Sequence, residues 1–234
     1  MHIKFFLFLL TLWGNFCFAQ SYGFFTPPKE WMAADPKMLS PRVKIGFLTK
    51  GKKEYCPSLN LAMEKVDISL EEYLKIVKTL HSKHKNTRWR DLGKFKTGAG
   101  MGHLTEIETK TTFGPARLLQ LIFIKDKMAY VMTASALKEE FSSYYQDFQK
   151  AFQSFTVTDD LFESAKNPSL RKAYDELMTA WQKRTPSLQS LTVDEDFNDR
   201  YFLPFQKKVM EECSEMGGYW QMLMLQYVQE KLSK

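Results

Sequence analysis

Residues 117–134, RLLQLIFIKDKMAYVMTA, decide the fold that this sequence predicts. The run from Leu118 to Ile124 is almost continuously apolar, as is typical of a central β-strand covered on both faces. Lys125-Asp126-Lys127 then supplies a turn, and Met128 to Ala134 forms a second strand pattern. The stretch therefore predicts a hairpin in the middle of an antiparallel sheet.

Strand and helix patterns continue on both sides of this hairpin. Ser69-Leu70-Glu71-Glu72 has the form of a capping box at a helix start, and Leu137–Phe152 carries aromatic residues at helical spacing. This order predicts an α+β fold in which an antiparallel sheet is sandwiched by helices. The other candidate strands lie at Tyr22–Trp31 (short and broken by prolines), Val43–Thr49, Leu59–Glu64, Trp89–Thr97 and Gly102–Thr112.

From Asp159 onward the pattern is entirely helical. Asn167-Pro168 is typical of a helix start, and Thr192 and Glu195 have capping-box spacing. Pro204 must break or kink the helix that contains it, and Gly217-Gly218 precedes a final helix. The Met and aromatic residues of this helical appendage indicate core packing, with an interface for a partner as the alternative.

The N-terminus predicts export. A basic start with Lys4 precedes the apolar run Phe5–Trp13, and the small residues Cys17 and Ala19 follow. The run is shorter than the roughly 20 apolar residues that span a bilayer. We therefore expect a periplasmic or secreted protein, which excludes nuclear and nucleic-acid roles; lipidation of Cys17 is the weaker alternative. The predicted regions are a signal peptide at 1–19, an α+β domain at 20–158 and a helical region at 159–234.

Two cysteines remain beyond the expected signal peptide, Cys56 and Cys213. An even pair in an oxidising compartment is a candidate disulfide, which would join the first third of the chain to its end. Two buried thiols are the alternative, because sequence does not show proximity.

A basic segment is the best functional candidate. The chain has a formal net charge of +6, which favours an acidic protein or an anionic membrane surface as the partner. Since export makes nucleic acid an unsuitable partner, a protein is preferred; the ordinary alternative is a solvated helix end. The candidate binding residues are Lys78, Lys83, Lys85, Arg88, Trp89 and Arg90.

Signals for catalysis are weak. His81 and His84 lack an obvious third metal ligand, and Gly98–Gly102 lacks the lysine and hydroxyl residue of a phosphate loop. We therefore expect no catalytic residue, no metal and no cofactor. An enzyme whose site assembles from His103, Glu106 and Cys56 is the runner-up hypothesis.

Four segments resemble the PsbP-like family, which includes photosystem-associated lumenal proteins and Mog-type Ran-binding proteins. They are Phe24–Trp31, Ser69–Leu74, Tyr130–Thr133 and the aromatic spacing from Phe141 to Phe155. The resemblance covers about residues 21–158, and it implies a binding fold without catalysis.

These observations together predict a non-catalytic, exported protein-binding or assembly factor of the cell envelope. The basic segment would contact the partner, and the helical region would add specificity or form a homodimer. The alternatives are the envelope enzyme and a chaperone-like carrier with a pocket between sheet and helix.

Overall fold

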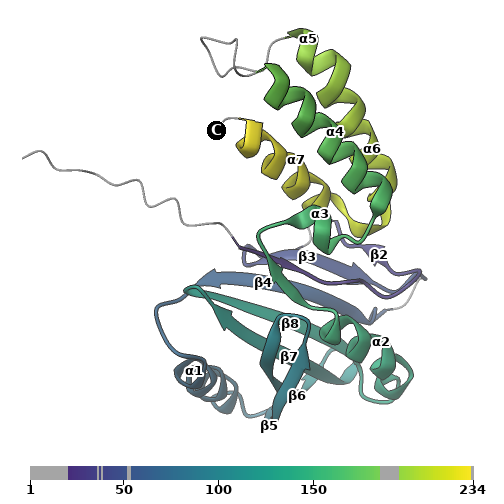
Figure 1. Cartoon of the computed structure of the whole chain (residues 1–234). Coiled ribbons are helices and arrows are strands. Elements are labelled where there is room, and N and C mark those ends of the chain that lie inside the picture. The colour runs from purple at the N-terminus through teal and green to yellow at the C-terminus, as the bar shows by residue number, and fades with distance from the viewer. Residues whose placement is uncertain (1–20, 36, 38, 52–53, 185–194, 233–234) are drawn as a thin grey trace, which may run out of the picture.

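The computed structural model describes residues 21–35, 37, 39–51, 54–184 and 195–232 (Figure 1). The predicted signal peptide and the capping residue Thr192 lie outside these residues. Within them, no helix is long and apolar enough to cross a membrane.

Seven of the described strands form one antiparallel sheet in the order β2-β3-β4-β8-β7-β6-β5. Two short strands pair with each other outside it, β1 (Tyr22–Phe24) and β9 (Thr156–Thr158). The predicted α+β fold with its antiparallel sheet is confirmed. The strands of the sheet are β2 (Met32–Ala33), β3 (Val43–Leu48), β4 (Ser58–Lys65), β5 (Thr87–Thr97), β6 (Gly100–Thr111), β7 (Gly114–Lys125) and β8 (Met128–Leu137).

The predicted central hairpin joins β7 to β8. Its turn residues Asp126 and Lys127 have φ angles of 51° and 60°, the left-handed pair found in tight hairpin turns. This turn sets a register in which Leu121 lies opposite Met132. Because side chains alternate between faces, that register places both residues on the same side of the sheet.

One face of the sheet carries the aromatic core. It is covered by α2 (Phe141–Gln153), by the segment that follows β1 and by the C-terminal helices (Figure 1). The ring of Trp220 lies 4.9 Å from that of Phe25, and the ring of Phe155 lies 5.7 Å from that of Tyr130. These contacts make the core continuous from the sheet to the last helix.

The opposite face is only partly covered, by α1 (Leu70–Ser82), which contacts β5 and β7. Ile122 is fully buried on this face, but Leu118 and Gln120 are half-buried. The prediction that this strand is covered on both faces is therefore wrong for part of its length. The apolar run identified a central strand, but it did not show how far a single helix reaches across the sheet.

The helical region follows β9 and stands on the side of the sheet away from α1 (Figure 1). Its described elements are α3 (Leu161–Ser164), α4 (Pro168–Arg184), α5 (Glu195–Phe197), a π-helical turn (Asn198–Phe202), α6 (Leu203–Glu212), a 3-10 turn (Ser214–Met216) and α7 (Gly218–Leu232). Pro204 lies in the first turn of α6. The structure continues helically through this point, and the Leu203 N–H donates to the Asn198 carbonyl across a widened turn instead of a break.

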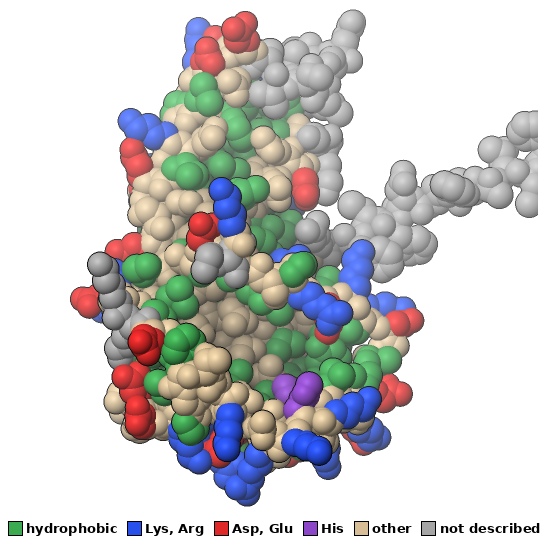
Figure 2. Space-filling model, turned by 180° about the vertical axis from the view of Figure 1, so that it is seen from behind, with side chains coloured by type: hydrophobic (Ala, Val, Ile, Leu, Met, Phe, Trp, Pro, Cys, Tyr) green, Lys and Arg blue, Asp and Glu red, His purple; other side chains and the backbone are tan. Residues whose placement is uncertain are grey.

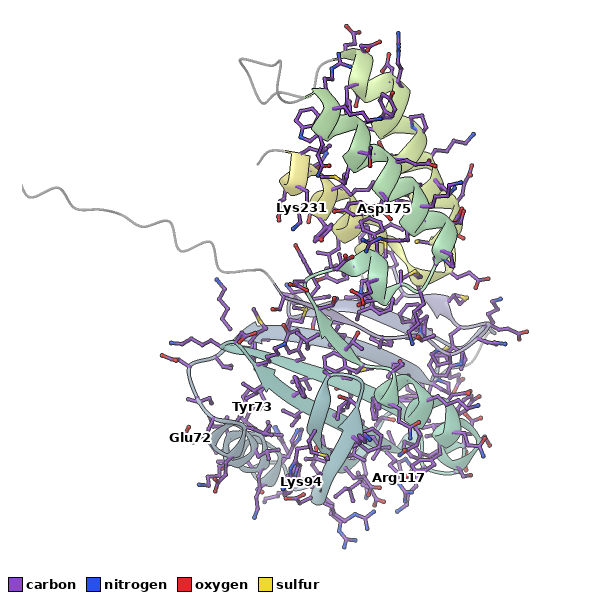
Figure 3. The ribbon with its side chains drawn as sticks, viewed as in Figure 1. Glu72, Tyr73, Lys94, Arg117, Asp175 and Lys231 are labelled. Carbon is purple, nitrogen blue, oxygen red and sulfur yellow. The ribbon has the colours of Figure 1, made fainter. Side chains whose placement is uncertain are left out.

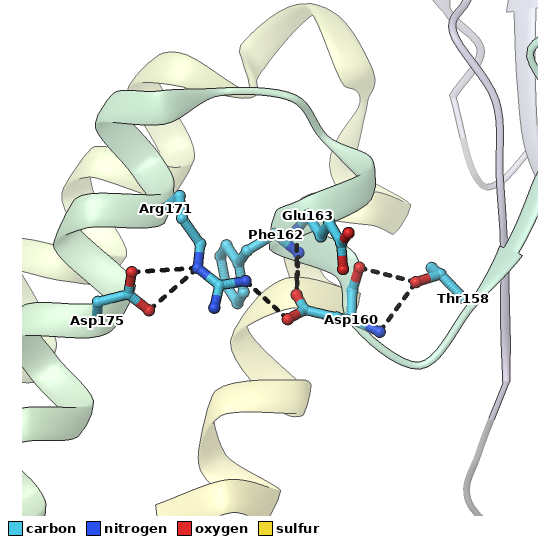
Figure 4. A network of polar contacts seen from close by, with 6 residues as sticks. All are labelled: Thr158, Asp160, Phe162, Glu163, Arg171 and Asp175. Atoms are coloured by element: carbon cyan, nitrogen blue, oxygen red, sulfur yellow. Dashed lines mark hydrogen bonds and ion pairs between the residues drawn. The ribbon is translucent and has the colours of Figure 1, made fainter.

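A polar network fixes the path from the sheet into the helices (Figure 4). The Asp160 carboxylate accepts hydrogen bonds from the amides of Phe162 and Glu163 and thereby caps α3. Arg171 of α4 donates to Asp160 at 2.7 Å and to Asp175 at 3.0 Å. The sheet and the helices also share one hydrophobic core. The division of the chain at residue 158 into an α+β domain and a helical region therefore stays a prediction.

Candidate functional site

The position of α1 is fixed by its first turn and by one contact with β4. Glu72 N–H donates to the Ser69 hydroxyl at 3.2 Å, and Ser69 N–H donates to the Glu72 carboxylate at 2.9 Å, so the predicted capping box is present. Hydrogen bonding from Ser69 lowers the pKa of Glu72. The Tyr73 hydroxyl donates to Glu64 of β4, which anchors the start of the helix over the sheet.

The six predicted binding residues do not share one surface. Trp89 faces α1, where the Lys78 ammonium lies 5.7 Å from the centre of its ring. Arg88 and Arg90 flank Trp89 on the same strand, so their side chains point to the opposite face of the sheet. There Arg90 pairs with Glu106, a carboxylate that is 8% exposed. The two arginines are therefore separated by the sheet from Lys78, which lies over Trp89.

A β-bulge adds two lysines that the prediction missed. The pairing of β5 with β6 shifts between Asp91 and Gly93, and Gly93 has a φ of 84°. The Gly93 N–H donates to the Asp91 carboxylate at 2.7 Å, which closes the bulge. The extra residue reverses the alternation of side chains, so Lys94 and Lys96 point to the same face as Trp89 (Figure 3 labels Lys94).

The resulting basic face consists of Lys78, Lys83, Lys85, Lys94 and Lys96. All five lysines are exposed, and none forms an ion pair with a carboxylate in the described part of the chain. Figure 2, which views the molecule from behind, shows Lys and Arg side chains gathered along the lower border of this side. The five lysines lie on the edge strand β5, at α1 and in the turn that joins the two elements.

One polar pair lies within the basic face. The Nε2 atom of His103 on β6 lies 2.6 Å from the Asp91 carboxylate. The His103 side chain is 17% exposed. Asp91 is thereby engaged by His103; the Lys78 ammonium also acts on it electrostatically but forms no ion pair with it. The adjacent Thr105 hydroxyl and Trp89 indole N–H are buried without a hydrogen-bond partner in the described structure.

The residues of the runner-up enzyme hypothesis are not brought together. His103 and Glu106 are three residues apart on one strand, so they point to opposite faces, and Glu106 is paired with Arg90. Cys56 lies in the turn before β4. Among the described residues, no group of three or more His, Cys, Asp or Glu side chains is arranged to hold a metal ion.

Cys213 is buried at the end of α6, where its thiol lies 3.8 Å from the Met224 sulfur. Burial raises the pKa of Cys213 to about 11, so the thiol stays protonated at neutral pH. The structure does not join Cys213 to Cys56. A disulfide between them stays a prediction for the exported protein.

Comparison with known proteins identifies relatives of the fold only. No protein-family model and no curated protein matches the chain. Similar solved structures include LpqN, involved in cell envelope biogenesis of Mycobacterium tuberculosis (13% identity, 59% of this chain, 84% of that chain, TM-score 0.46). They also include PsbP from Synechocystis sp. PCC 6803, with 14% identity over 62% of this chain and 96% of that chain and a TM-score of 0.44. A third is the Ran-binding protein Mog1p of Saccharomyces cerevisiae, with 14% identity over 59% of this chain and 95% of that chain and a TM-score of 0.41.

The similar solved structures thus include a PsbP protein and a Mog-type protein, the two groups that the sequence resemblance named. At such identities and TM-scores, this likeness determines neither function nor partner. The functional argument rests on the side chains of this chain.

Proposed function

We propose that the protein is a non-catalytic, exported binding factor of the cell envelope, and that its basic face contacts an acidic protein. The observation that carries this proposal is the set of five exposed lysines on α1, on β5 and in the turn between them, none of which forms an ion pair in the described part of the chain. On the helices α4 and α6, by contrast, exposed lysines lie beside carboxylates one helical turn away, such as Lys172 with Glu176 and Lys207 with Glu211. Exposed lysines without an ion pair also occur singly elsewhere, as at Lys29 and Lys150, but the basic face gathers five of them on α1, β5 and the turn between them. The basic face therefore differs from an ordinary charge-balanced surface.

Unpaired lysines on one face produce a positive potential that extends beyond the surface. Such a potential attracts a partner of opposite charge and increases the rate of encounter. It decays over about 8 Å at physiological ionic strength, so binding through this face depends on salt. Export is supported by the N-terminal sequence pattern and limits the available partners to those of the envelope or the exterior.

The test is affinity capture of the full-length chain after cross-linking in its native cell. The wild type is compared with a Lys78→Glu, Lys83→Glu, Lys94→Glu variant. A Lys29→Glu, Lys125→Glu, Lys150→Glu variant serves as the matched control, because it makes the same charge change at exposed lysines outside the basic face. We expect one stoichiometric protein that the wild type and the control retain, that the first variant loses, and that higher salt releases.

Three other results would contradict the proposal. Retention by both variants would exclude the basic face as the contact, and equal loss from both would indicate a dependence on net charge alone. Binding of the purified protein to phosphatidylglycerol vesicles, without any protein captured from cells, would replace the protein partner with an anionic membrane surface.

A further inference from the structure

The partly covered face of the sheet contains a trough beside α1. Several side chains of this face along β4, β7 and β8 are only half-buried, although they lie in the middle of a seven-stranded sheet. Ile122, Ala129 and Ser135 of the same face are buried and border the half-buried area. Figure 2 shows this region from outside as a recessed area with hydrophobic side chains around it. The floor residues, which are uncharged, are Asn60, Ala62, Leu118, Gln120, Val131 and Thr133.

One flank of α1 forms a wall of this trough. Lys78 lies on the flank toward the edge strand β5, as its contact with Trp89 shows, and Tyr73 lies on the other flank and bonds Glu64 of β4. Residues three, four and seven positions apart share a helix side, so Ile76 and Leu80 lie on the flank of Tyr73. Their side chains are 48% and 55% exposed. The wall that Ile76 and Leu80 form is therefore apolar, and in the described structure much of it is exposed.

The opposite border of the trough is closed by the segment before β3. Gly46 of β3 lies beneath it: a Cβ at this glycine would lie 3.1 Å from the Leu39 side chain and 3.5 Å from that of Ala34. Away from the start of α1, where Tyr73 meets Glu64 of β4, the strands β4, β8 and the near side of β7 lie between this segment and α1. Strands about 4.8 Å apart give a width of roughly 10–14 Å, which corresponds to the 10–12 Å diameter of one helix.

Two other occupants fit less well. A second copy packed sheet to sheet would bury the outer side of α1, which carries the exposed Glu71, Glu72 and Lys75. An added β-strand would need free backbone groups, but β4 and β8 are already paired on both sides. Recognition on this face must therefore use side chains.

We propose that the trough receives one amphipathic α-helix of the partner protein, packed beside α1; this inference rests on the proposed function. The contacting side of that helix carries apolar residues at helical spacing against Ile76, Leu80 and Val131, and one polar side chain meets Gln120 or Thr133. Lys83 follows Leu80 by three residues and borders the same flank. An acidic residue of the partner helix pairs with it, so the trough continues into the basic face.

The test places a photo-crosslinker in the full-length protein in its native cell, as Ile76→p-benzoylphenylalanine and Leu80→p-benzoylphenylalanine. Met222→p-benzoylphenylalanine on α7 is the matched control, because Met222 is a helical residue that is 62% exposed. We expect positions 76 and 80 to react with one partner segment, at residues of that segment spaced three or four apart, and position 222 not to react with it. A synthetic peptide of the cross-linked segment should bind at least tenfold more weakly to an Ile76→Glu, Leu80→Glu variant.

Cross-links to a second copy of this chain, to lipid, or to alternate residues of an extended segment would overturn the inference. So would equal reaction from position 222. If the lysine variant loses its partner but positions 76 and 80 react with nothing, the proposed function stands and the trough does not bind the partner. If no partner protein is captured at all, both proposals fail.

Discussion

The two thirteen-residue helices that pack on the sheet, α1 and α2, differ in what they bury. Both carry apolar side chains at helical spacing, and they lie on opposite faces of the sheet. Four residues of α2 are buried, whereas no residue of α1 is. Phe148 of α2 packs into the aromatic core, with its ring 6.0 Å from Trp31. The half-buried inner side of α1 includes Leu74 and Val77, and two polar contacts join the helix to the sheet, from the Tyr73 hydroxyl to Glu64 and from the Lys78 ammonium to the Trp89 ring.

This difference separates the face that stabilises the fold from the face on which we propose recognition. The α2 face buries aromatic surface, which is the main source of folding free energy. The α1 face keeps apolar and basic side chains accessible at a small energetic cost, since α1 is a short helix anchored by its cap and a few contacts. Four experiments test or extend the contrast, and they follow from the largest expected effect to the smallest.

Phe148→Ala should destabilise the protein by about 3–5 kcal/mol, because it removes a fully buried ring and leaves a cavity. Val77→Ala on the inner side of α1 should cost about 1 kcal/mol, because Val77 is only half-buried. Urea unfolding monitored by circular dichroism measures both values. Equal losses would show that the two helices contribute equally, against the contrast drawn here.

Glu106→Gln should cost about 1.5–3 kcal/mol, because this buried carboxylate accepts charged hydrogen bonds from Arg90 and lies 3.7 Å from the Arg117 guanidinium. The comparison on the α1 face is His103→Gln, which disturbs a pair whose aspartate is about half exposed and should cost less than about 1 kcal/mol. Denaturant midpoints of the two variants decide the order. A larger loss for His103→Gln would assign the more important polar contact to the α1 face.

Ser69→Ala should cost about 1 kcal/mol, because it removes the side-chain acceptor of the capping box. The expected loss is comparable to that of Val77→Ala, which would show that the cap holds α1 as firmly as its packing does. Hydrogen exchange of the α1 amides should accelerate while exchange in α2 stays unchanged. Faster exchange in both helices would indicate that α1 opens only with the whole fold.

The smallest expected effect is the contribution of His81 to the pH dependence of stability. Burial, assisted by the nearby charge of His84, lowers the pKa of His81 below its ordinary value of 6.5. The native state then favours the neutral ring, so the unfolded state binds more protons once the pH falls below about 6.5. Stability is unaffected above that pH and decreases below it. His81→Gln should show a smaller loss of melting temperature between pH 7 and 5 than the wild type, and identical losses would contradict the assignment.

Much of the fold followed from local patterns. The apolar run after Arg117 identified a central strand, and Lys125-Asp126-Lys127 identified its turn, since a tight hairpin needs particular residues at its corner. Ser69 and Glu72, which are three residues apart, identified the start of a helix. These signals are strong because each depends on neighbours within one turn or one hairpin.

The candidate site was predicted only in part. Lys78, Lys83 and Lys85 are exposed in the structure, whereas Arg88 and Arg90 point to the face of the sheet opposite Trp89. Whether any of these residues binds a partner stays a prediction. Alternation along β5 could have separated the arginines from Trp89. Gly93 was the one available signal for the bulge that adds Lys94 and Lys96, and a lone glycine in a strand has several explanations.

The sequence by itself determined the elements, the hairpin turn, the helix cap and the change to a helical region after β9. Only the tertiary structure decided which face each side chain occupies, how much of the sheet α1 covers and where Trp220 joins the core. The physical reason is the range of the interactions. Turns and caps depend on residues a few positions apart, whereas the bulge, the open trough and the shared core depend on pairings between strands and helices that are distant in the chain.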